Sequence, residues 1–380
     1  MTKPRILYIV TQADWGGAQK YVFELAIAAQ DELEVSVAVG HSQDRTLVTR
    51  LNEYGITVHE LNHLVRPLSP YHDLANAWEI AQVIRQIKPD IVHLNSSKAG
   101  ITGTCGSVIA RLFGTKHRLV YTVHGWAFRE SINLVYRGVY AVSEWLLSWP
   151  RDLVIFIGAA DERAARYFPL RQHVCIANGI DPDISFIERN IARQQLGVSA
   201  DSFVVGTIAN FYATKNLGQF IAIINQARTV IPNLAAVIIG DGDLRPQLEA
   251  QINDLSLVDV IKLPGKLPNA SAHLKAFDAY LITSTKEGLP FSLLEAMSAE
   301  LPIVTSNIEG LNDIITEATN GLLFDVTNTR AAVDALVNFY QKQDRARTLG
   351  QAARQTLIAN YTQRSMIGQT LAAYRVLVAK

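Results

Sequence analysis

Two glutamates flank the predicted start of a helix in the stretch TSTKEGLPFSLLEAM, residues 283–297. Glu287 precedes Pro290, and Glu295 follows about one turn into the apolar run. Proline is favoured in the first turn of a helix, so the backbone amides at this start are predicted to face the end of the preceding strand-like run. Amides in that position form an anion site. The two carboxylates could therefore serve as an acid–base pair, as metal ligands or as acceptors for an uncharged ligand.

The predicted helix start favours the third reading. The amide groups of Leu289, Phe291 and Ser292 would form the anion pocket. Glu287 and Glu295 would repel a phosphate in that pocket unless they bind hydroxyl groups. Carboxylates are good acceptors for paired sugar hydroxyls. The residues alone therefore predict a ligand with phosphates in the middle and sugars at both ends.

Three other stretches place chemically useful residues at the ends of predicted strands. Gly16 and Gly17 in DWGGAQKYVFELA allow a close backbone approach to a ligand, or form an ordinary tight turn. His124 in YTVHGWAF ends a strand, where a side chain can point into a crevice, although a single histidine is more often structural. Lys215 in TIANFYATKNLGQF starts a helix, where its charge opposes the macrodipole. An anion between the two would remove that penalty, and a solvated lysine is the common alternative.

Several motifs resemble metal or nucleotide signatures without the required context. The letters HELNH at residues 59–63 match a zinc-protease motif, but they follow a strand-type run instead of lying on a helix. The acidic pairs at residues 181–183 and 241–243 resemble ligands of a divalent cation, but Asp241 and Asp243 more simply close a strand and cap the helix that starts near Leu244. GDGDLR lacks the third glycine of a dinucleotide fingerprint. We expect no metal ion in this protein.

Composition limits the class of protein. With 380 residues the chain is long for one core, so two domains are expected. Equal numbers of basic and acidic residues, 35 each, argue against a nucleic-acid partner. Cys105 and Cys175 have no metal spacing and favour a reducing compartment. The first ten residues are typical of a strand and not of a signal peptide, so we expect a cytoplasmic protein.

An aromatic-rich stretch, INLVYRGVYAVSEWLLSW, occupies residues 132–149. Arg137 and Glu144 interrupt it, so it is not expected to cross a membrane. An amphipathic core helix is the simpler interpretation. The alternative is a helix that docks on a membrane or on a lipid-linked substrate, because Trp and Tyr favour the membrane interface.

Predicted strands alternate with helical stretches along the whole chain. This alternation predicts two doubly wound α/β domains with parallel sheets, joined near Pro182. Ligands of such sheets bind at the carboxyl ends of the strands, and a two-domain chain offers a cleft. The last helical stretch, residues 362–380, could belong to either domain by its pattern. The predicted strands are residues 6–10, 35–39, 57–61, 91–94, 119–123, 153–157, 174–177, 204–209, 236–239, 260–263, 279–284, 303–306 and 322–324.

These motifs, taken in order, resemble the family-4 retaining glycosyltransferases of the GT-B type. The similarity extends over essentially the whole chain: GGAQKYVFELA, VHLNSSKAG, TVHGW, ANGID, IGDGDLRPQLE, EGLPFSLLEAMSAELPIVTS and NGLLF. It implies a GT-B architecture of two Rossmann-like domains facing a central cleft. Residues 1–182 would bind the acceptor and residues 183–361 the nucleotide sugar, while residues 362–380 would cross back to the N-terminal domain.

The resemblance also implies roles for individual residues. Glu295 would hold the ribose hydroxyls, Glu287 the donor sugar and Lys215 the diphosphate. His124 would contact the donor sugar near the reacting centre. The remaining donor-binding positions implied are Gly16, Gly17, Lys266, Leu267, Gly288, Leu289, Pro290 and Phe291.

One departure from the family pattern concerns charge. The family often has an arginine five residues before the lysine, as a second cation on the diphosphate, and Asn210 occupies that place here. An amide cannot make the two-pronged contact of a guanidinium. Either Lys286 or Arg129 supplies the missing positive charge, or fewer positive charges hold the diphosphate. Gln19 also stands where the family commonly has glutamate.

The expected activity is therefore retaining, metal-independent transfer of a sugar from a nucleotide-diphosphate donor, UDP-linked by resemblance. The acceptor would be a glycan or a polyprenyl-linked glycan of bacterial surface polysaccharide (exopolysaccharide, capsule or O-antigen), met in the cytoplasm or at the inner face of the membrane, with no cofactor. Two alternatives remain: a nucleotide-sugar 2-epimerase of the same fold, and a non-catalytic nucleotide-sugar-binding protein.

Overall fold

A computed structural model describes residues 3–65, 69–129 and 133–379. The chain divides into two compact units, which we call the N-terminal unit (Met1–Asn178 with Ser365–Lys380) and the C-terminal unit (Gly179–Arg364). The division falls slightly before the join near Pro182 expected from the sequence. The last helix is grouped with the N-terminal unit, which the periodicity alone had left open.

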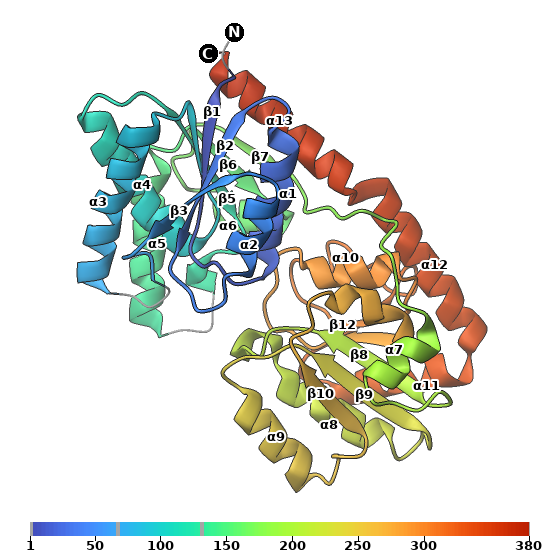
Figure 1. Ribbon diagram of the computed structural model, residues 1–380. Coiled ribbons are helices and arrows are strands. Elements are labelled where there is room, and N and C mark those ends of the chain that lie inside the picture. The colour runs from blue at the N-terminus through green and yellow to red at the C-terminus, as the bar shows by residue number, and fades with distance from the viewer. Residues whose placement is uncertain (1–2, 66–68, 130–132, 380) are drawn as a thin grey trace. The chain divides into compact units, whose positions relative to one another are not determined.

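The N-terminal unit contains a sheet of seven described strands in the order β3-β2-β1-β4-β5-β6-β7. Every neighbouring pair is parallel. Figure 1 shows its helices on both faces of the sheet. The elements are β1 (Arg5–Val10), α1 (Gly17–Ala29), β2 (Glu34–Gly40), α2 (Thr46–Glu53), β3 (Thr57–Leu61), α3 (Pro70–Ile87), β4 (Ile91–Leu94), α4 (Ser97–Leu112), β5 (Arg118–Val123), η1 (Ala127–Arg129), α5 (Leu134–Ser148), β6 (Leu153–Phe156), α6 (Ala159–Ala164), β7 (His173–Cys175) and α13 (Gln363–Val378).

The C-terminal unit contains six described strands in the order β10-β9-β8-β11-β12-β13, again all parallel. The predicted fold class, two parallel-sheet α/β domains, is confirmed. The elements are α7 (Arg189–Gln195), β8 (Phe203–Ile208), η2 (Ala213–Lys215), α8 (Leu217–Ala227), β9 (Leu234–Ile239), α9 (Arg245–Asp254), β10 (Ile261–Gly265), η3 (Ala270–Ala276), β11 (Ala279–Ile282), α10 (Phe291–Ser298), β12 (Ile303–Ser306), β13 (Leu322–Phe324), α11 (Thr329–Gln341) and α12 (Gln343–Asn360).

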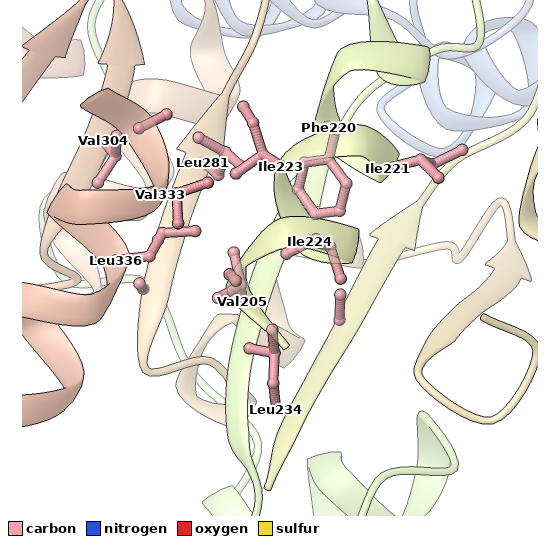
Figure 2. Packing of buried hydrophobic residues seen from close by; sticks show 14 of the residues in the cluster. Val205, Phe220, Ile221, Ile223, Ile224, Leu234, Leu281, Val304, Val333 and Leu336 are labelled. Carbon is pink, nitrogen blue, oxygen red and sulfur yellow. The ribbon is translucent and has the colours of Figure 1, made fainter. Parts of the chain in front are cut away.

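Helix α8 supplies much of the C-terminal core. Its Phe220 and Ile224 are fully buried and lie over the sheet beside Val205 of β8, as Figure 2 shows. Val333 and Leu336 of α11 join the same cluster. Strands that helices cover on both faces have continuous apolar sequences. The positions of these strands could therefore be predicted from the sequence.

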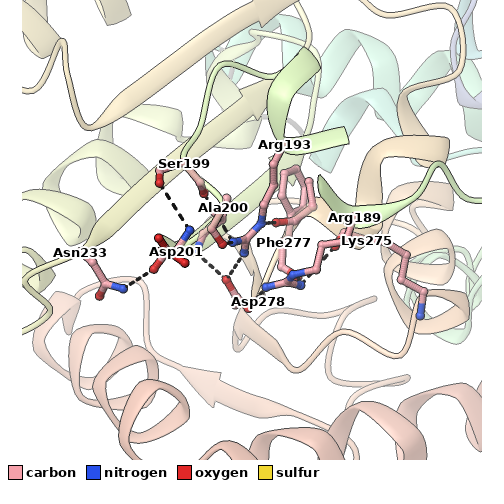
Figure 3. Close-up of polar contacts among 11 residues, drawn as sticks. Arg189, Arg193, Ser199, Ala200, Asp201, Asn233, Lys275, Phe277 and Asp278 are labelled. Atoms are coloured by element: carbon pink, nitrogen blue, oxygen red, sulfur yellow. Dashed lines mark hydrogen bonds and ion pairs between the residues drawn. The ribbon is translucent and has the colours of Figure 1, made fainter. Parts of the chain in front are cut away.

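A polar network around the buried Arg193 lies at the amino-terminal edge of this sheet (Figure 3). Asp278, just before β11, accepts hydrogen bonds from Arg193 (2.7 Å), from Arg189 (2.5 Å) and from the amide of Val204 (2.7 Å). Arg193 also donates to the carbonyl of Ala276 at 3.0 Å. The network therefore attaches α7 to the starts of β8 and β11, and charged partners satisfy the buried groups.

Helix α13 is held to the N-terminal unit by a buried hydrogen-bond chain. The Tyr374 hydroxyl lies 2.6 Å from Nδ1 of His93, whose Nε2 lies 2.7 Å from the hydroxyl of Thr122. At the surface, Arg375 pairs with Glu32, which follows α1. Figure 1 shows α13 alongside α1. The last helix is thus an integral part of this unit.

Helix α5 corrects one prediction. The core-helix interpretation of residues 132–149 is wrong for the described part, because the aliphatic and aromatic side chains of α5 are largely exposed. Its fully buried side chains include Glu144, which pairs with fully buried Arg151 at 2.8 Å. Burial raises the pKa of Glu144, and the charge of Arg151 opposes that shift. Residue 132 lies outside the described residues. No helix in the described part of the chain is long and apolar enough to cross a membrane.

We expect acid to destabilise the N-terminal unit. Burial lowers the pKa of His93 to about 3 and those of His117 and His124 to about 4, against 6.5 when exposed. Between these values the unfolded unit binds protons that the folded unit does not, so its free energy of unfolding falls as pH falls from 6.5 towards 4. Urea unfolding at pH 7 and pH 5, followed by tryptophan fluorescence, measures this.

The chain offers an internal control for that measurement. All five tryptophans lie in the N-terminal unit, and the C-terminal unit holds one histidine of the nine, His273. Fluorescence therefore reports on the unit that holds His93, His117 and His124, and amide exchange of the C-terminal core reports on the other. An unfolding midpoint that is the same at both pH values would contradict the expectation. The five tryptophans are Trp15, Trp78, Trp126, Trp145 and Trp149.

Candidate functional site

An ion pair lies at the carboxyl edge of the C-terminal sheet. The ammonium of Lys215 lies 2.6 Å from Oε1 of Glu287, and the hydroxyl of Ser284 donates to the same oxygen at 2.6 Å. The Glu287 side chain is 9% exposed and that of Lys215 is 23% exposed. A carboxylate with so little access to water is stabilised by its cation and by the hydroxyl. The structure therefore joins two residues that the sequence singled out separately.

The ends of β8 and β11 hold this pair in place. The hydroxyl of Thr283 lies 3.1 Å from the carbonyl oxygens of both Lys215 and Asn216, and Thr285 donates its amide to Thr214 at 2.9 Å. The loop that follows β8 is thus tied to the loop that follows β11. Sequence reasoning missed Thr283 and Ser284, although both stand in the TST motif that opens the stretch around Glu287.

Helix α10 begins between the two glutamates, as predicted. Pro290 is its N-cap, and no side chain among the described residues caps this end. Glu295 is buried one turn into the helix, near enough to Tyr280 of β11 for its charge to act on that hydroxyl. Burial raises the pKa of Tyr280 to about 12. A hydrogen bond with Ser292 lowers this pKa, and the charge of Glu295 raises it further. The positive end of the helix therefore lies between two carboxylates.

Gly310 allows the loop of Glu287 and Gly288 to lie close to the next connection. Its φ is +92°, and an added Cβ would lie 2.4 Å from the carbonyl oxygen of Gly288 and 2.5 Å from that of Glu287. Both the backbone conformation and the lack of space require glycine there.

Asn210 lies where three loops meet. Phe211 donates its amide to Asp241 at 2.9 Å, and Gly240 donates to the carbonyl of Gly265 at 3.0 Å. Arg245 lies over the Phe211 ring, 5.3 Å from its centroid, and donates to Asp241 at 2.8 Å. The structure thus brings a guanidinium, missed by the sequence analysis, to the loop that lacks the expected arginine.

The predicted base-binding residues adjoin this junction. Lys266 and Leu267 follow β10 directly, and Lys266 lies near Asp241. The pKa of Asp241 is lowered, first by the hydrogen bond from Arg245, and the charge of Lys266 contributes. Asp241 therefore links the loops after β8, β9 and β10 through Phe211, Arg245 and Lys266.

His124 lies at the carboxyl edge of the N-terminal sheet, directly after β5. The ring of Tyr21 packs against it edge-on, with centroids 4.9 Å apart. Burial lowers the pKa of His124 to about 4, so the imidazole is neutral at pH 7. Its Nε2 is buried and has no hydrogen-bond partner among the described residues. Gly125 follows with φ of +122°, which favours glycine.

The glycine pair lies at the same edge of that sheet, before α1. Gly16 is the N-cap, and an added Cβ would lie 2.9 Å from Oε1 of Gln19. The Gln19 amide donates to the carbonyl of Gln12 at 3.2 Å, which a glutamate could not do. The glutamine that replaces the family's usual glutamate therefore braces the loop between β1 and α1.

Lys286 and Arg129 are the two cations that could replace the arginine missing at position 210. Arg129 forms an ion pair within the N-terminal unit. Its guanidinium lies 3.3 Å from Asp161, which also accepts from the indole of Trp126 through its carbonyl at 2.9 Å. Lys286 immediately precedes Glu287 on the loop after β11.

Comparison with known proteins agrees with this architecture. Residues 15–184 match the family described as Glycosyltransferase Family 4, and residues 188–356 match Glycosyl transferases group 1. The chain belongs to family 4 of the glycosyltransferases. Among relatives, it is 29% identical over 299 residues to UDP-Gal:alpha-D-GlcNAc-diphosphoundecaprenol alpha-1,3-galactosyltransferase of Escherichia coli, covering 72% of each chain.

Two further similarities extend the comparison. The glycosyltransferase is 25% identical over 316 residues to the lipopolysaccharide core biosynthesis glycosyltransferase LpsD of Rhizobium meliloti, covering 82% of this chain and 80% of that one. The crystal structure of Anabaena Alr3699/HepE in complex with UDP and glucose superposes with a TM-score of 0.83 at 22% identity, covering 98% and 99% of the two chains. The GT-B fold implied by the motifs is thereby confirmed.

The glycosyltransferase should show no ionisation of His124 near neutral pH. Because the pKa of this imidazole is about 4, it stays neutral from about pH 5.5 to about 8.5, and kcat/KM over that range should show no inflection that depends on it. Parallel pH profiles of the wild type and of His124→Asn test this. An inflection between about pH 6 and 7 that disappears in the variant would contradict the assignment of a neutral imidazole.

Proposed function

We propose that this glycosyltransferase moves a sugar, with retention, from a UDP-sugar to a glycan carried on a polyprenyl diphosphate. The observation that carries the proposal is the Lys215–Glu287 pair beside the start of α10. Positive groups for a diphosphate and carboxylates for hydroxyls lie together at one sheet edge. The relatives and the UDP complex described above support the donor class, and the Escherichia coli relative supports a lipid-linked acceptor.

Each donor fragment has a proposed partner in the C-terminal unit. Glu295 accepts from the ribose hydroxyls and Glu287 from hydroxyls of the transferred sugar. Lys215 and the backbone of Gly288 to Phe291 hold the diphosphate. Backbone of Lys266 and Leu267 meets the base. Asn210 and Arg245 border the junction between the base and phosphate positions, so Arg245 offers positive charge on the side where the family has its second cation.

The reaction breaks the bond between the anomeric carbon and the diphosphate and forms one to an acceptor hydroxyl on the same face. The hydroxyl proton leaves with the diphosphate oxygen. Lys215 and the positive end of α10 stabilise the charge that develops on the leaving group. These groups supply the stabilisation that a metal ion supplies in other enzymes, so we propose that none is required.

Lys215 must change partners when the donor binds. Its ammonium now balances Glu287 at 2.6 Å. A diphosphate would compete for that ammonium, while the sugar hydroxyls would replace it as hydrogen-bond donors to the carboxylate. The exchange keeps the buried carboxylate and the partly exposed ammonium paired before and after binding. The neutral imidazole of His124 is suited to a hydrogen bond with the sugar and not to charge stabilisation.

A lipid-linked acceptor would lie at a membrane, and the exposed apolar face of α5 could bind there. We propose that this face rests on a bilayer surface. Aromatic side chains at such a boundary favour the interface, and a helix of 15 residues lies in the surface without spanning it. The exposed apolar residues of this face are Leu134, Val135, Tyr136, Val139, Val142, Trp145, Leu146 and Trp149.

Replacing Lys215 should remove turnover without removing the fold. Lys215→Met is expected to lower kcat by roughly 10²–10³-fold, because one positive group no longer meets the developing charge. Glu287→Gln should lower kcat/KM for the donor. Mass spectrometry of a UDP-sugar panel with polyprenyl-diphosphate oligosaccharides, in buffer with EDTA, measures transfer. Wild-type rates in both variants would overturn the assignment of this site.

A double variant separates stability from catalysis in that test. Lys215→Met alone leaves a nearly buried carboxylate without its cation and should lower the melting temperature. Adding Glu287→Gln removes the unpaired charge and should restore the melting temperature while turnover stays low. Conversion of the donor to an epimer without acceptor would show a nucleotide-sugar 2-epimerase. Binding of the donor by the wild type without any turnover would show a non-catalytic binding protein.

Lipid vesicles test the α5 face separately. The wild type should float with vesicles of phosphatidylethanolamine and phosphatidylglycerol, and the double variant Val139→Asp with Leu146→Asp should not, because two charges would enter the interface. Val258→Asp, an equally exposed position on the C-terminal unit, is the matched control. Flotation of the α5 variant at wild-type levels would refute the membrane role.

A further inference from the structure

A concave surface lies on the N-terminal unit, beside the glycine loop. A groove of about 720 Å³ is bordered by the first turn of α2, the end of α2 and one residue of α1. None of the residues singled out in the sequence lines it. The lining residues are Phe23, Gln43, Asp44, Arg45, Thr46, Thr49, Arg50, Glu53 and Tyr54.

A ladder of aromatic rings links this groove to the glycine loop. Arg50 lies over the ring of Trp15 at 3.9 Å from its centroid. Trp15 packs edge-on against Phe23, and Phe23 packs edge-on against Tyr54, each with centroids 5.6 Å apart. Trp15 directly precedes Gly16. The groove and the loop between β1 and α1 therefore share one set of packed side chains.

The backbone joins the same two segments. Leu47, in the first turn of α2, donates its amide to the carbonyl of Ala13 at 2.9 Å. Asp44, just before α2, accepts from the amide of Thr46 at 3.0 Å. The groove is thus attached to the loop between β1 and α1, at the sheet edge that also carries His124, and the loop between β2 and α2 supplies three of its residues.

The chemistry of the groove fits neutral sugar rings. Its lining holds two arginines and two carboxylates, so it has no excess of either charge for an anion or a cation. Arg45 is paired with Glu60, and Arg50 covers Trp15. An exposed Tyr54 ring beside hydroxyl, amide and carboxylate groups offers an apolar face for a pyranose ring and acceptors and donors for its hydroxyls.

The geometry of α1 relates the groove to the reacting end of the acceptor. Tyr21 packs against His124, and Phe23, two residues later, borders the groove. Residues two apart point to opposite sides of a helix. The groove and His124 therefore lie on opposite sides of α1, at least the width of a helix apart, roughly 10–12 Å. An acceptor that reaches both would pass around the start of α1 at the glycine loop, a path long enough for an oligosaccharide and too long for a single sugar.

We propose that this groove is a remote acceptor subsite, which binds sugar units of the growing glycan away from the hydroxyl that reacts. The inference rests on the proposed transferase function and adds to it that the acceptor is an oligosaccharide. Binding energy gained in the groove holds the acceptor in place, so longer acceptors bind more tightly than short ones.

Tyr54→Ala tests the subsite with a ladder of free oligosaccharides, one to five sugars long, released by mild acid from polyprenyl-diphosphate glycans. The variant should raise the acceptor KM at least about fivefold for the longer members and leave it unchanged for the single sugar, since one lost ring contact is worth about 1 kcal/mol. Tyr54→Phe should behave as the wild type, because it keeps the ring. An equal KM in wild type and Tyr54→Ala for every length would overturn the subsite.

Phe113→Ala provides a matched control. Phe113 is 56% exposed, against 53% for Tyr54, packs against Trp78 and lies under Arg85, but it stands at the end of α4 outside the groove. It should change no acceptor KM. A KM rise in this variant equal to that of Tyr54→Ala would show a general effect on the unit and overturn the subsite.

A readout without turnover separates this inference from the proposed function. Saturation-transfer NMR with the same ladder and no donor should show contacts of the longer members with the wild type and not with Tyr54→Ala. If the wild type binds the ladder but transfers nothing from any donor, the transferase proposal fails and the groove stands. If it transfers sugar but Tyr54→Ala binds and uses every acceptor normally, the groove fails alone.

Discussion

Parallel pairing of the strands is the constraint on which the rest of this molecule depends. Every strand pair in both sheets is parallel, so the carboxyl ends of the strands in each unit meet at one edge. Each crossover returns through a helix or a long connection, and the loop after each strand stays at that edge. Lys215 after β8 and Glu287 after β11 meet for this reason, although 72 residues separate them.

The same constraint explains how far the sequence could predict the site. The end of a buried parallel strand is visible as the point where an apolar run meets a polar or glycine residue, and this marked Gly16, His124, Lys215 and Glu287. The order of strands is not visible locally. Only the placement of β8 beside β11 brings Thr283 to the carbonyl of Lys215, so the contacts that orient the pair could not be predicted from either motif alone.

Helix α5 shows where a periodic pattern misleads. In the sequence, Glu144 interrupts an apolar stretch and argues against a membrane span. In the fold it is buried, because Arg151, beyond the helix end, supplies a charge and lies over the ring of Tyr121 at 4.1 Å. A charged side chain is buried only where a partner exists, and that partner is set by tertiary structure. The apolar residues of α5 are consequently the ones left outside.

The contacts around Asn210 bear on the missing arginine. An arginine there would add a cation to a loop beside which Arg245 already lies, over the ring of Phe211 and bonded to Asp241. With asparagine, the charges of Lys215 and Glu287 cancel, and the pair stays fixed by Ser284 and by the Thr283 contacts. The ammonium of Lys215 is then held in a defined place before the donor arrives, which reduces the ordering needed on binding. An arginine would add positive charge for the diphosphate, whereas the Lys215–Glu287 pair contributes a fixed position for the one lysine.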